Sequence, residues 1–461
     1  MDPRLAGDLA RTPDLLEAVR ARAVQILAAL PDRPAAVPPP PAKPSPLPAG
    51  AGLEGALAEF SERWEPGFSG SAGPRYLGFV TGGTTPAALA GDWLTGVLDQ
   101  NAAPSLDSAA SDLERETVSW LRELFGITAE HSGAFVSGAT MSNMVGLAIA
   151  REWLGEQQGI SVADAGVSAL NGCRVYSATP HSSAYKALSM LGMGRDSLHL
   201  VPTLPDREAI DVDALAEALA AAPGPAIVIA NAGTVNTVDF DDLEAIAALR
   251  ERHPFWLHVD AAFGAFAALS PAHAHLTAGL TLADSICVDL HKWLNVPYDS
   301  AIQLTRRRDL QVRVFQNAAA YLGLPTADPD FVHLTPENSR RLRALPAWFA
   351  LRAYGLEGHR SIVERNIAQA HRLASLLSPG WRLLSPVRLN VVCFAPARTD
   401  PDTVIRSLTA SGTTFLTPTV YKGIPALRAA FSNWRTSDAD VDLIARELNA
   451  RDRHLPGDDQ P

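Results

Sequence analysis

The chain has 461 residues, of which 47% are hydrophobic and 19% charged, a composition typical of about two or three packed globular domains. Its formal charge of −11 argues against nucleic acid or an anionic membrane as a partner, because those surfaces require clustered Lys and Arg. The sequence has no apolar leader, no run of about 18 apolar residues and no Cys/His cluster. We therefore expect a cytoplasmic protein without a membrane span or a metal site.

Residues 1–73 are expected to form an N-terminal helical segment and a proline-rich linker. Thr12 suits the N-cap of a helix and Pro13 its first turn. The apolar side of this helix, at steps of three and four residues, comprises Leu16, Val19, Ala23, Leu27 and Leu30. The prolines of residues 38–46 cannot continue a helix and predict an extended connector, with an SH3-type ligand as the alternative.

Between residues 133 and 305, short apolar runs rich in β-branched residues alternate with amphipathic stretches. This alternation predicts an α/β fold with a mostly parallel central sheet, helices on both faces and ligands at the carboxyl ends of the strands. The expected strands are 134–136, 174–176, 226–229, 255–259, 285–288 and 301–304. We assign residues 74–345 to a large domain. Residues 346–461, with a helical stretch, a strand at 389–394 and a last helix near 441–448, should form a smaller C-terminal α+β domain.

Two charged residues lie where expected strands end. Asp260 closes the strand at 255–259, and Lys292 follows the strand at 285–288. Pyridoxal phosphate (PLP) requires such a pair, because an amine holds its aldehyde and a carboxylate keeps its ring nitrogen protonated. We expect partial burial to lower the pKa of Lys292 toward values that favour imine formation. As alternatives, a lone lysine is usually solvated, and an aspartate at this position could be a cap or a salt-bridge partner.

Two strand-to-helix turns offer further candidates. Residues 133–143 pass from a strand through the small residues Ser137 and Gly138 into a helix, a layout that points backbone N–H groups at an anion. The turn lacks a Walker lysine and a GxGxxG motif, so an ordinary tight turn is the alternative. His181 precedes a second helix, where its imidazole could stack on an aromatic cofactor; an isolated histidine there is more often a helix-end or surface residue.

In order and spacing, these segments resemble the group II pyridoxal-dependent decarboxylases, the family of aromatic-amino-acid, glutamate, histidine and diaminobutyrate decarboxylases. The resemblance extends from about Pro74 to Thr436. It implies a fold type I, aspartate-aminotransferase-like PLP-dependent transferase with pyridoxal 5'-phosphate as cofactor. It also implies a homodimer with active sites at the interface and an amino acid as the substrate.

Carried over by position, the resemblance implies a role for each matching residue. The catalytic residues would be Lys292, which forms the internal aldimine, Asp260, which binds the pyridine nitrogen, and His181, which stacks on the ring. Further cofactor contacts would come from Ala139, Thr140, Thr234, Ala262 and His291, and the substrate pocket would include Phe79, Val80 and Thr81. The implied reaction converts an L-amino acid, with an aromatic or apolar side chain favoured by Phe79 and Val80, to an amine and CO2 through a quinonoid.

Two positions depart from the family pattern. Asp289 stands where many members have asparagine; a carboxylate suits a dianionic phosphate poorly, and we assign Asp289 no role. A gap-free match places Phe331 in the substrate pocket, where aromatic decarboxylases have a loop tyrosine that protonates the quinonoid. Phenylalanine has no acidic proton, and relatives with phenylalanine there can react with oxygen to give an aldehyde, ammonia and peroxide. The alternatives are a shifted alignment, or protonation by His333 or a water.

Two other functions agree with fewer of these residues. A transaminase would need a carboxylate-binding arginine; Arg435 is the candidate, although a structural ion pair suits it better. A non-catalytic PLP-binding or regulatory protein would not need Lys292, Asp260 and His181 together. We therefore favour the decarboxylase, with the aldehyde synthase as its alternative.

Overall fold

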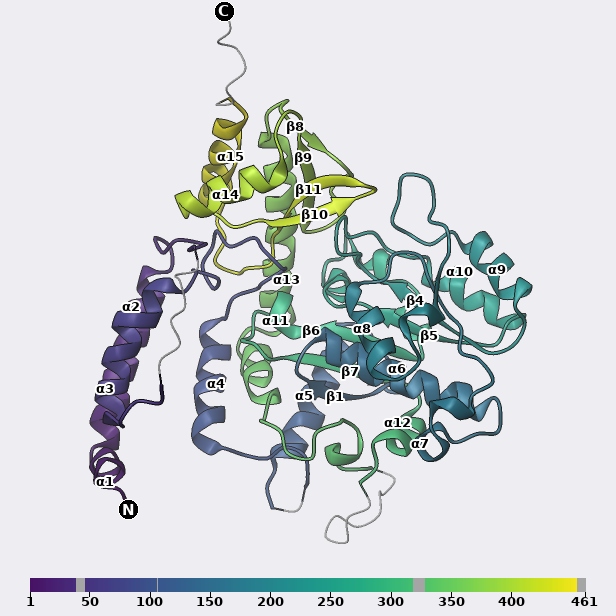
Figure 1. The fold of residues 1–461 in the computed structure, drawn as a ribbon, viewed down its shortest axis with the longest axis horizontal. Helices are drawn as coiled ribbons and strands as arrows, with labels where there is room; N and C mark the ends of the chain where they lie inside the picture. Colours follow the sequence, from purple (N-terminus) through teal and green to yellow (C-terminus); the bar gives the residue numbers. More distant parts are fainter. Residues whose placement is uncertain (39–45, 106, 318–327, 454–461) are drawn as a thin grey trace, which may run out of the picture.

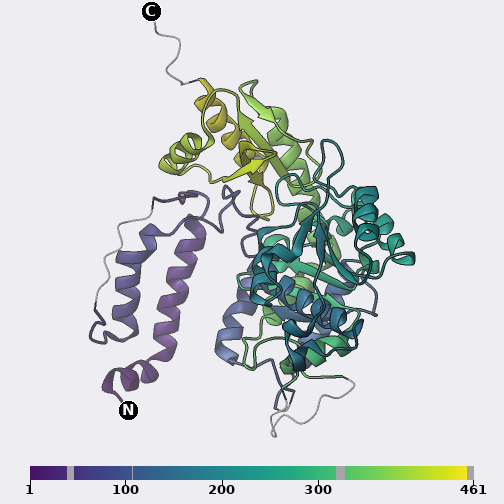
Figure 2. The ribbon, with the colours of Figure 1, turned by 45° about the vertical axis from the view of Figure 1, so that its right-hand side comes forward.

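The computed structural model describes residues 1–38, 46–105, 107–317 and 328–453. The chain forms a helical arm, a large body around a seven-stranded sheet, and a smaller unit around a four-stranded sheet (Figure 1). The arm stands to one side of the body in both views, and the smaller unit lies above the large sheet (Figure 2). The proline-rich run for which we expect a connector lies almost wholly outside the described residues.

The arm consists of α1 (Pro3–Ala10), α2 (Thr12–Ala29) and α3 (Gly52–Glu59), followed by a π-helical turn at Phe60–Trp64. Helix α2 begins at Thr12 with Pro13 in its first turn, so the predicted start is confirmed. The predicted N-cap is wrong by one residue, because Arg11 occupies that position and makes no side-chain capping bond. Its covered side agrees with the expected one at Val19, Ala23, Leu27 and Leu30, which are half-buried or buried. It differs at Leu16, which is 54% exposed, whereas its neighbour Leu15 is buried. Neighbouring helix positions differ by about 100° in direction, so Leu16 faces solvent when Leu15 is covered.

The large sheet contains, among the described residues, β1 (Ser132–Val136), β2 (Val175–Ser177), β3 (Leu198–Leu200), β4 (Ala226–Asn231), β5 (Phe255–Asp260), β6 (Ser285–Asp289) and β7 (Ala301–Thr305). The strand order is β1-β7-β6-β5-β4-β2-β3, with β7 antiparallel to both of its neighbours. The register aligns the carboxyl ends of β4, β5 and β6 at one edge of the sheet. The predicted mostly parallel sheet is confirmed. Strand β3 was not expected, because two of its three residues are exposed and its sequence therefore lacks an apolar run.

Alternate residues of the central strands face opposite layers of helices. On β4, Ile227 and Ile229 pack in the cluster that contains residues of α6 and α8, whereas Val228 and Ala230 pack in the cluster on the other face. The whole of β4 is buried, which explains its unbroken apolar sequence. The helices of this body are α4 (Pro86–Leu98), α5 (Ala110–Leu124), α6 (Ala139–Glu156), α7 (Val162–Ala165), α8 (Ser182–Met190), α9 (Val212–Ala221), α10 (Leu243–Ala248), α11 (Leu290–Trp293) and α12 (Arg308–Phe315).

The smaller unit contains an antiparallel sheet in the order β10-β11-β9-β8. Its elements are β8 (Trp381–Leu383), β9 (Val391–Pro396), α14 (Pro401–Ser411), β10 (Thr417–Tyr421), β11 (Ile424–Ala430) and α15 (Asp438–Arg453). Helix α13 (Ala344–Leu376), which kinks at Gly355 with a φ of 57°, joins it to the large body (Figure 1). The predicted C-terminal α+β unit is confirmed, while the boundaries at residues 73 and 345 stay predictions. None of the helices in the described ranges has both the length and the apolar character needed to cross a bilayer.

Candidate active site

The expected site residues converge where strands of the large sheet end. Asp260 is the last residue of β5, Asp289 is the last residue of β6, and Lys292 follows in the short helix α11. His181 is the N-cap of α8, which follows β2. These four side chains line one pocket of about 380 Å³. The amine and the carboxylate that the sequence places at separate strand ends therefore share one cavity.

Lys292 pairs with the carboxylate of Asp289 and is also influenced by the charge of Asp260. Its Nζ is 3.0 Å from Oδ2 of Asp289, and the two side chains are only 16% and 4% exposed. Burial by itself lowers the pKa of Lys292, but Asp289 and Asp260 outweigh it and raise the pKa above its ordinary value. The expected lowering of this pKa is therefore wrong. The reason is the contact with Asp289, which holds the amine as an ammonium ion.

A buried hydrogen-bond network orients the carboxylate of Asp260. Asn143 Nδ2 donates to Asp260 Oδ2 at 2.9 Å, and Asn143 Oδ1 lies 2.9 Å from His258 Nε2. His258 Nδ1 is 2.7 Å from Ser285 Oγ, which accepts from Trp256 Nε1 at 2.9 Å. Burial lowers the pKa of His258 to about 4, so the ring is neutral. Ser285 can then donate to Nδ1, His258 donates through Nε2, and Asn143 must present its NH2 group to Asp260.

The same network sets the tautomer of His181. Its Nδ1 accepts from the backbone N–H of Ser183 at 3.2 Å and lies 2.7 Å from Ser183 Oγ. Because Asn143 Nδ2 donates to Ser183 Oγ at 3.0 Å, the hydroxyl proton of Ser183 is free to point to His181. Desolvation in the pocket lowers the pKa of His181, which favours the neutral ring. A neutral His181 therefore carries its proton on Nε2.

The N-terminus of α6 opens into the same pocket. Ala139 and Thr140, in its first turn, line the pocket, so the positive end of an 18-residue helix faces the cavity. Ala139 N donates to Asp289 Oδ1 at 2.7 Å. His291 Nδ1 lies 3.0 Å from the carbonyl oxygen of Ser300, and His291 Nε2 lies 3.5 Å from Asp289 Oδ2. Two of the three residues expected at the phosphate, Ala139 and His291, thus lie next to Asp289.

The segment expected at the substrate passes over Lys292. Phe79 and Val80 line the pocket and have left-handed φ values of 54° and 59°. Non-glycine residues rarely adopt this conformation, and such strain gathers at functional sites. Gly82 is required next to them, because a Cβ at this position would approach the carbonyl oxygen of Lys292 to 1.7 Å. Close packing on α11 therefore explains the glycine.

Of three further residues expected to line the site, only one does. Ala262 lines the pocket, whereas Thr81 and Thr234 do not. The hydroxyl of Thr81 lies 3.1 Å from that of Tyr298, which itself lines the pocket. Thr234 Oγ1 donates to Glu208 Oε2 at 2.5 Å. The proton of the Thr234 hydroxyl is therefore already committed to a buried carboxylate.

Phe331 lies outside this pocket within the described chain. It is 2% exposed in a 3₁₀ turn and lines a separate hollow of about 150 Å³. The guanidinium of Arg340 lies 4.7 Å from the centre of its ring, and Arg340 forms a fully buried ion pair with Glu114. His333, the alternative proton donor, is in the same turn and also 2% exposed. Within one subunit, neither residue lines the pocket of Lys292.

Arg428 is a pocket residue that the sequence analysis missed. It comes from β11 of the smaller unit, is 6% exposed and lines the pocket of Lys292. Its Nη1 donates to the carbonyl oxygen of Val235 at 2.5 Å, while its Nε has no hydrogen-bond partner among the described residues. Arg435, the arginine singled out from the sequence, instead stacks on Trp434 and is not in the pocket lining. A buried guanidinium with a free N–H favours an anionic ligand.

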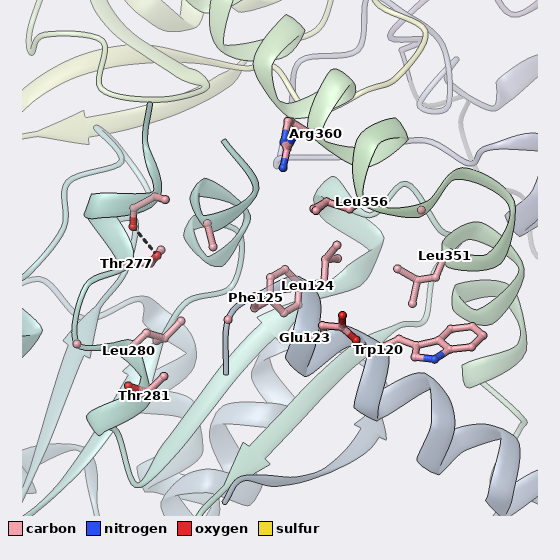
Figure 3. A pocket seen from close by; sticks show the side chains of 15 residues that line it. Trp120, Glu123, Leu124, Phe125, Thr277, Leu280, Thr281, Leu351, Leu356 and Arg360 are labelled. Carbon is pink, nitrogen blue, oxygen red and sulfur yellow. Dashed lines mark hydrogen bonds between the residues drawn. The ribbon is translucent and has the colours of Figure 1, made fainter. Parts of the chain in front are cut away.

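A larger hollow lies elsewhere (Figure 3). It measures about 550 Å³, and α5 and α13 contribute apolar residues such as Trp120 and Leu351. Of its charged lining residues, Arg360 already pairs with Glu357, and Glu123 is exposed. Among the described residues that line it there is no lysine, so size alone does not identify the reactive site.

Comparison with known proteins agrees with this geometry. Residues 53–396 match the model of the pyridoxal-dependent decarboxylase conserved domain. The aromatic-L-amino-acid decarboxylase of Bacillus atrophaeus is 27% identical over 400 residues, covering 82% of this chain and 81% of its own. Catharanthus roseus tryptophan decarboxylase, solved in complex with L-tryptophan, has a TM-score of 0.83 at 21% identity, with 95% and 98% of the two chains covered. Rhodiola rosea 4-hydroxyphenylacetaldehyde synthase has a TM-score of 0.86 at 20% identity, with 98% of this chain and 99% of its own covered.

The fold and the pocket together define a PLP-dependent enzyme. The side chains present suit this cofactor, because an amine, a carboxylate and a helix N-terminus line one cavity of sufficient size. The chain belongs to the pyridoxal-dependent decarboxylase family, in which the cofactor is pyridoxal 5'-phosphate and the activity is that of an amino-acid carboxy-lyase.

Proposed function

We propose that this enzyme decarboxylates an L-amino acid with an aromatic or apolar side chain to an amine and CO2. The observation that carries the proposal is the pocket shared by Lys292, Asp260 and His181. The apolar side chains of Phe79 and Val80 in its lining support the substrate class, as does the similarity to an aromatic-L-amino-acid decarboxylase. Assay of CO2 release from each standard amino acid tests this. Turnover confined to acidic or basic substrates would contradict the proposed class.

When bound, PLP supplies an electron sink for the charge that departing CO2 leaves behind. Lys292 would hold the aldehyde carbon, and Asp260, oriented by Asn143, would keep a proton on the ring nitrogen. His181, with its proton on Nε2, would cover one face of the ring, and Ala262 would pack on the other. Each of these side chains lines the pocket, except Asn143, which acts through Asp260.

The phosphate would be held by Ala139, Thr140 and His291 at the N-terminus of α6. Thr234 would act only through its neighbours, because Gly233 and Val235 line the pocket while its own hydroxyl donates to Glu208. Thr81 would support the pocket wall through Tyr298.

Arg428 would bind the carboxylate of the substrate. We expect Arg428→Gln to raise KM by about tenfold to a hundredfold, the loss of one charge-assisted hydrogen-bonding group, while the visible absorbance of the bound cofactor is retained. Steady-state kinetics check the first result and absorbance titration the second. Arg435→Gln is the matched control, because Arg435 does not line the pocket. Equal kinetics for Arg428→Gln and the parent enzyme would remove Arg428 from substrate binding.

The active form would be a cytoplasmic homodimer with active sites at the interface. Exposed apolar residues of the arm support the dimer, since Leu5, Leu9 and Val24 are 59%, 64% and 50% exposed. Apolar surface of this kind is commonly covered by a partner. Sedimentation as a single chain of 49.0 kDa would contradict the dimer, and the cellular location of a tagged chain tests the compartment.

The second candidate function is oxidative: decarboxylation with release of an aldehyde, supported by Phe331 in place of the family's loop tyrosine. The structural similarity to an aldehyde synthase covers 98% of this chain, although at 20% identity it concerns the fold alone. Because Phe331 lies beneath Arg340 within its own subunit, this candidate requires Phe331 to act in a site completed by the second subunit.

We expect Phe331→Tyr to shift the product from aldehyde toward amine if the second candidate is correct, because the phenol supplies the missing proton. An oxygen electrode combined with amine and aldehyde analysis measures the ratio. Phe135→Tyr, at a buried strand position outside the pocket, controls for the added hydroxyl. An unchanged product ratio would exclude Phe331 from the mechanism.

A further inference from the structure

Asp289 is a charged side chain at the helix end of the pocket to which the proposed function gives no role. Its Oδ1 accepts from Ala139 N at 2.7 Å, and its Oδ2 lies 3.0 Å from Lys292 Nζ and 3.5 Å from His291 Nε2. The side chain is only 4% exposed. A carboxylate thus occupies the anion-binding end of α6 and touches the groups proposed to hold the cofactor.

Binding of a phosphate at this helix end brings two anions together. Both compete for the N–H of Ala139, and repulsion between like charges is strong where water is excluded. Condensation of Lys292 with an aldehyde also alters the ammonium group that pairs with Asp289. An ionised Asp289 would then face the phosphate with fewer favourable contacts.

The contact between His291 and Asp289 has a position for one proton. The carbonyl oxygen of Ser300 can only accept, so His291 carries its hydrogen on Nδ1. A neutral His291 therefore presents the lone pair of Nε2 to Asp289 Oδ2 across 3.5 Å. Two lone pairs face each other unless a proton lies between them. A protonated Asp289 donates to Nε2 through Oδ2 and still accepts from Ala139 through Oδ1.

We propose that Asp289 takes up one proton from solution when the phosphate of the cofactor binds, so that cofactor loading is coupled to protonation of this carboxylate. The proposal rests on the proposed cofactor site. The ionised carboxylate stabilises the ammonium of Lys292 before loading, and the neutral acid accommodates the phosphate afterwards. Asp289 is a positioning residue that ties the affinity for the cofactor to pH.

The other ionisable groups around Asp289 favour its protonation when the phosphate binds. Lys292 and His291, both on α11, face Oδ2, and burial lowers the pKa of His291, which keeps that ring a neutral acceptor. Asp260 on β5 adds a second negative charge, and burial raises the pKa of Cys287 on β6 well above its ordinary value, so its thiol stays neutral. The nearby His181 is neutral as well, which leaves Lys292 as the cation in contact with Asp289.

Asp289→Asn imitates the protonated state, because its amide can accept from Ala139 and donate to His291. The experiment compares the affinities for PLP and for pyridoxal, which has the same aldehyde and ring but no phosphate, by titration of visible absorbance from about pH 6 to about pH 8. The ratio of the two affinities cancels any effect on Lys292. We divide the ratio for the parent enzyme by the same ratio for Asp289→Asn. We expect this quotient to fall by up to about tenfold for each unit by which the pH rises.

A pH-independent quotient near one would overturn the proposal, since Asp289 would then act equally on both ligands. Asp309→Asn is the control, because Asp309 pairs with Arg307 and does not line the pocket; its quotient should stay near one. Asp289→Ser serves if the asparagine variant does not fold. Failure of the parent enzyme to bind PLP through Lys292 would contradict the proposed function, whereas a flat quotient with normal absorbance contradicts only the role of Asp289.

Discussion

Replacement of Lys292 by alanine is expected to abolish the visible absorbance of bound cofactor and to lower kcat/KM by about 10⁴-fold or more, as loss of a covalent catalytic group does in other enzymes. The physical reason is that no other described lysine lines the pocket, so no amine remains to hold the aldehyde. Absorbance spectra and CO2 release measure the two effects.

Two further variants separate the effect of the positive charge at position 292 from the ability of the lysine to form an imine. Lys292→Arg keeps a cation beside Asp289 but cannot form an imine, so it should fold as well as the parent enzyme and remain inactive. Lys186→Ala, on the exposed side of α8, should leave both absorbance and turnover unchanged. Appreciable turnover in Lys292→Ala would refute the assignment of the cofactor-binding lysine.

Asp260→Asn is expected to lower kcat by about 100- to 1,000-fold, the usual effect of removing one electrostatic contact that stabilises the transition state. A neutral amide cannot hold a proton on the ring nitrogen. The new NH2 group would also face that of Asn143, which His258 fixes in its present orientation. Single-turnover kinetics of the PLP-loaded variant measure this loss.

Asp241→Asn provides the control for removal of a buried carboxylate. Asp241 accepts from the backbone N–H groups of Ile210 and Asn231, and it does not line the pocket. A single amide oxygen cannot accept from both N–H groups, so Asp241→Asn should lower the stability of the fold. The folded variant should nevertheless retain kcat, because Asp241 does not line the pocket. A similar loss of kcat in both variants would point to a general structural effect instead of a role for Asp260 at the ring.

Local patterns were enough to predict much of the large sheet. The unbroken apolar run of β4 reflects a strand covered on both faces, and the helix beginning at Thr12 reflects the proline in its first turn. Because parallel strands bring their carboxyl ends to one edge, the polar residues after β5 and β6 could be expected in one cavity. The structure places Asp260 and Lys292 there together, while their chemical roles stay predictions.

Contacts between distant segments could not be predicted in this way. Arg428 enters the pocket only because the smaller unit docks on the large one, and nothing in the local sequence of β11 indicates it. The burial of Phe331 under Arg340 depends on the ion pair with Glu114 from another part of the chain. The pKa of Lys292 rises instead of falling because Asp289 lies within 3.0 Å of its Nζ.

From the sequence alone, short-range periodicity predicted the α/β class and the strand ends, and residue chemistry pointed to an amine and an acid there. The resemblance to a known family added the cofactor and the fold type. Tertiary structure decided which charges meet inside the pocket: the ammonium ion whose pKa two carboxylates raise, the guanidinium from the smaller unit and the carboxylate at the helix end. Electrostatic energies depend on distances of a few ångströms and on the exclusion of water, and both arise only when distant segments pack together.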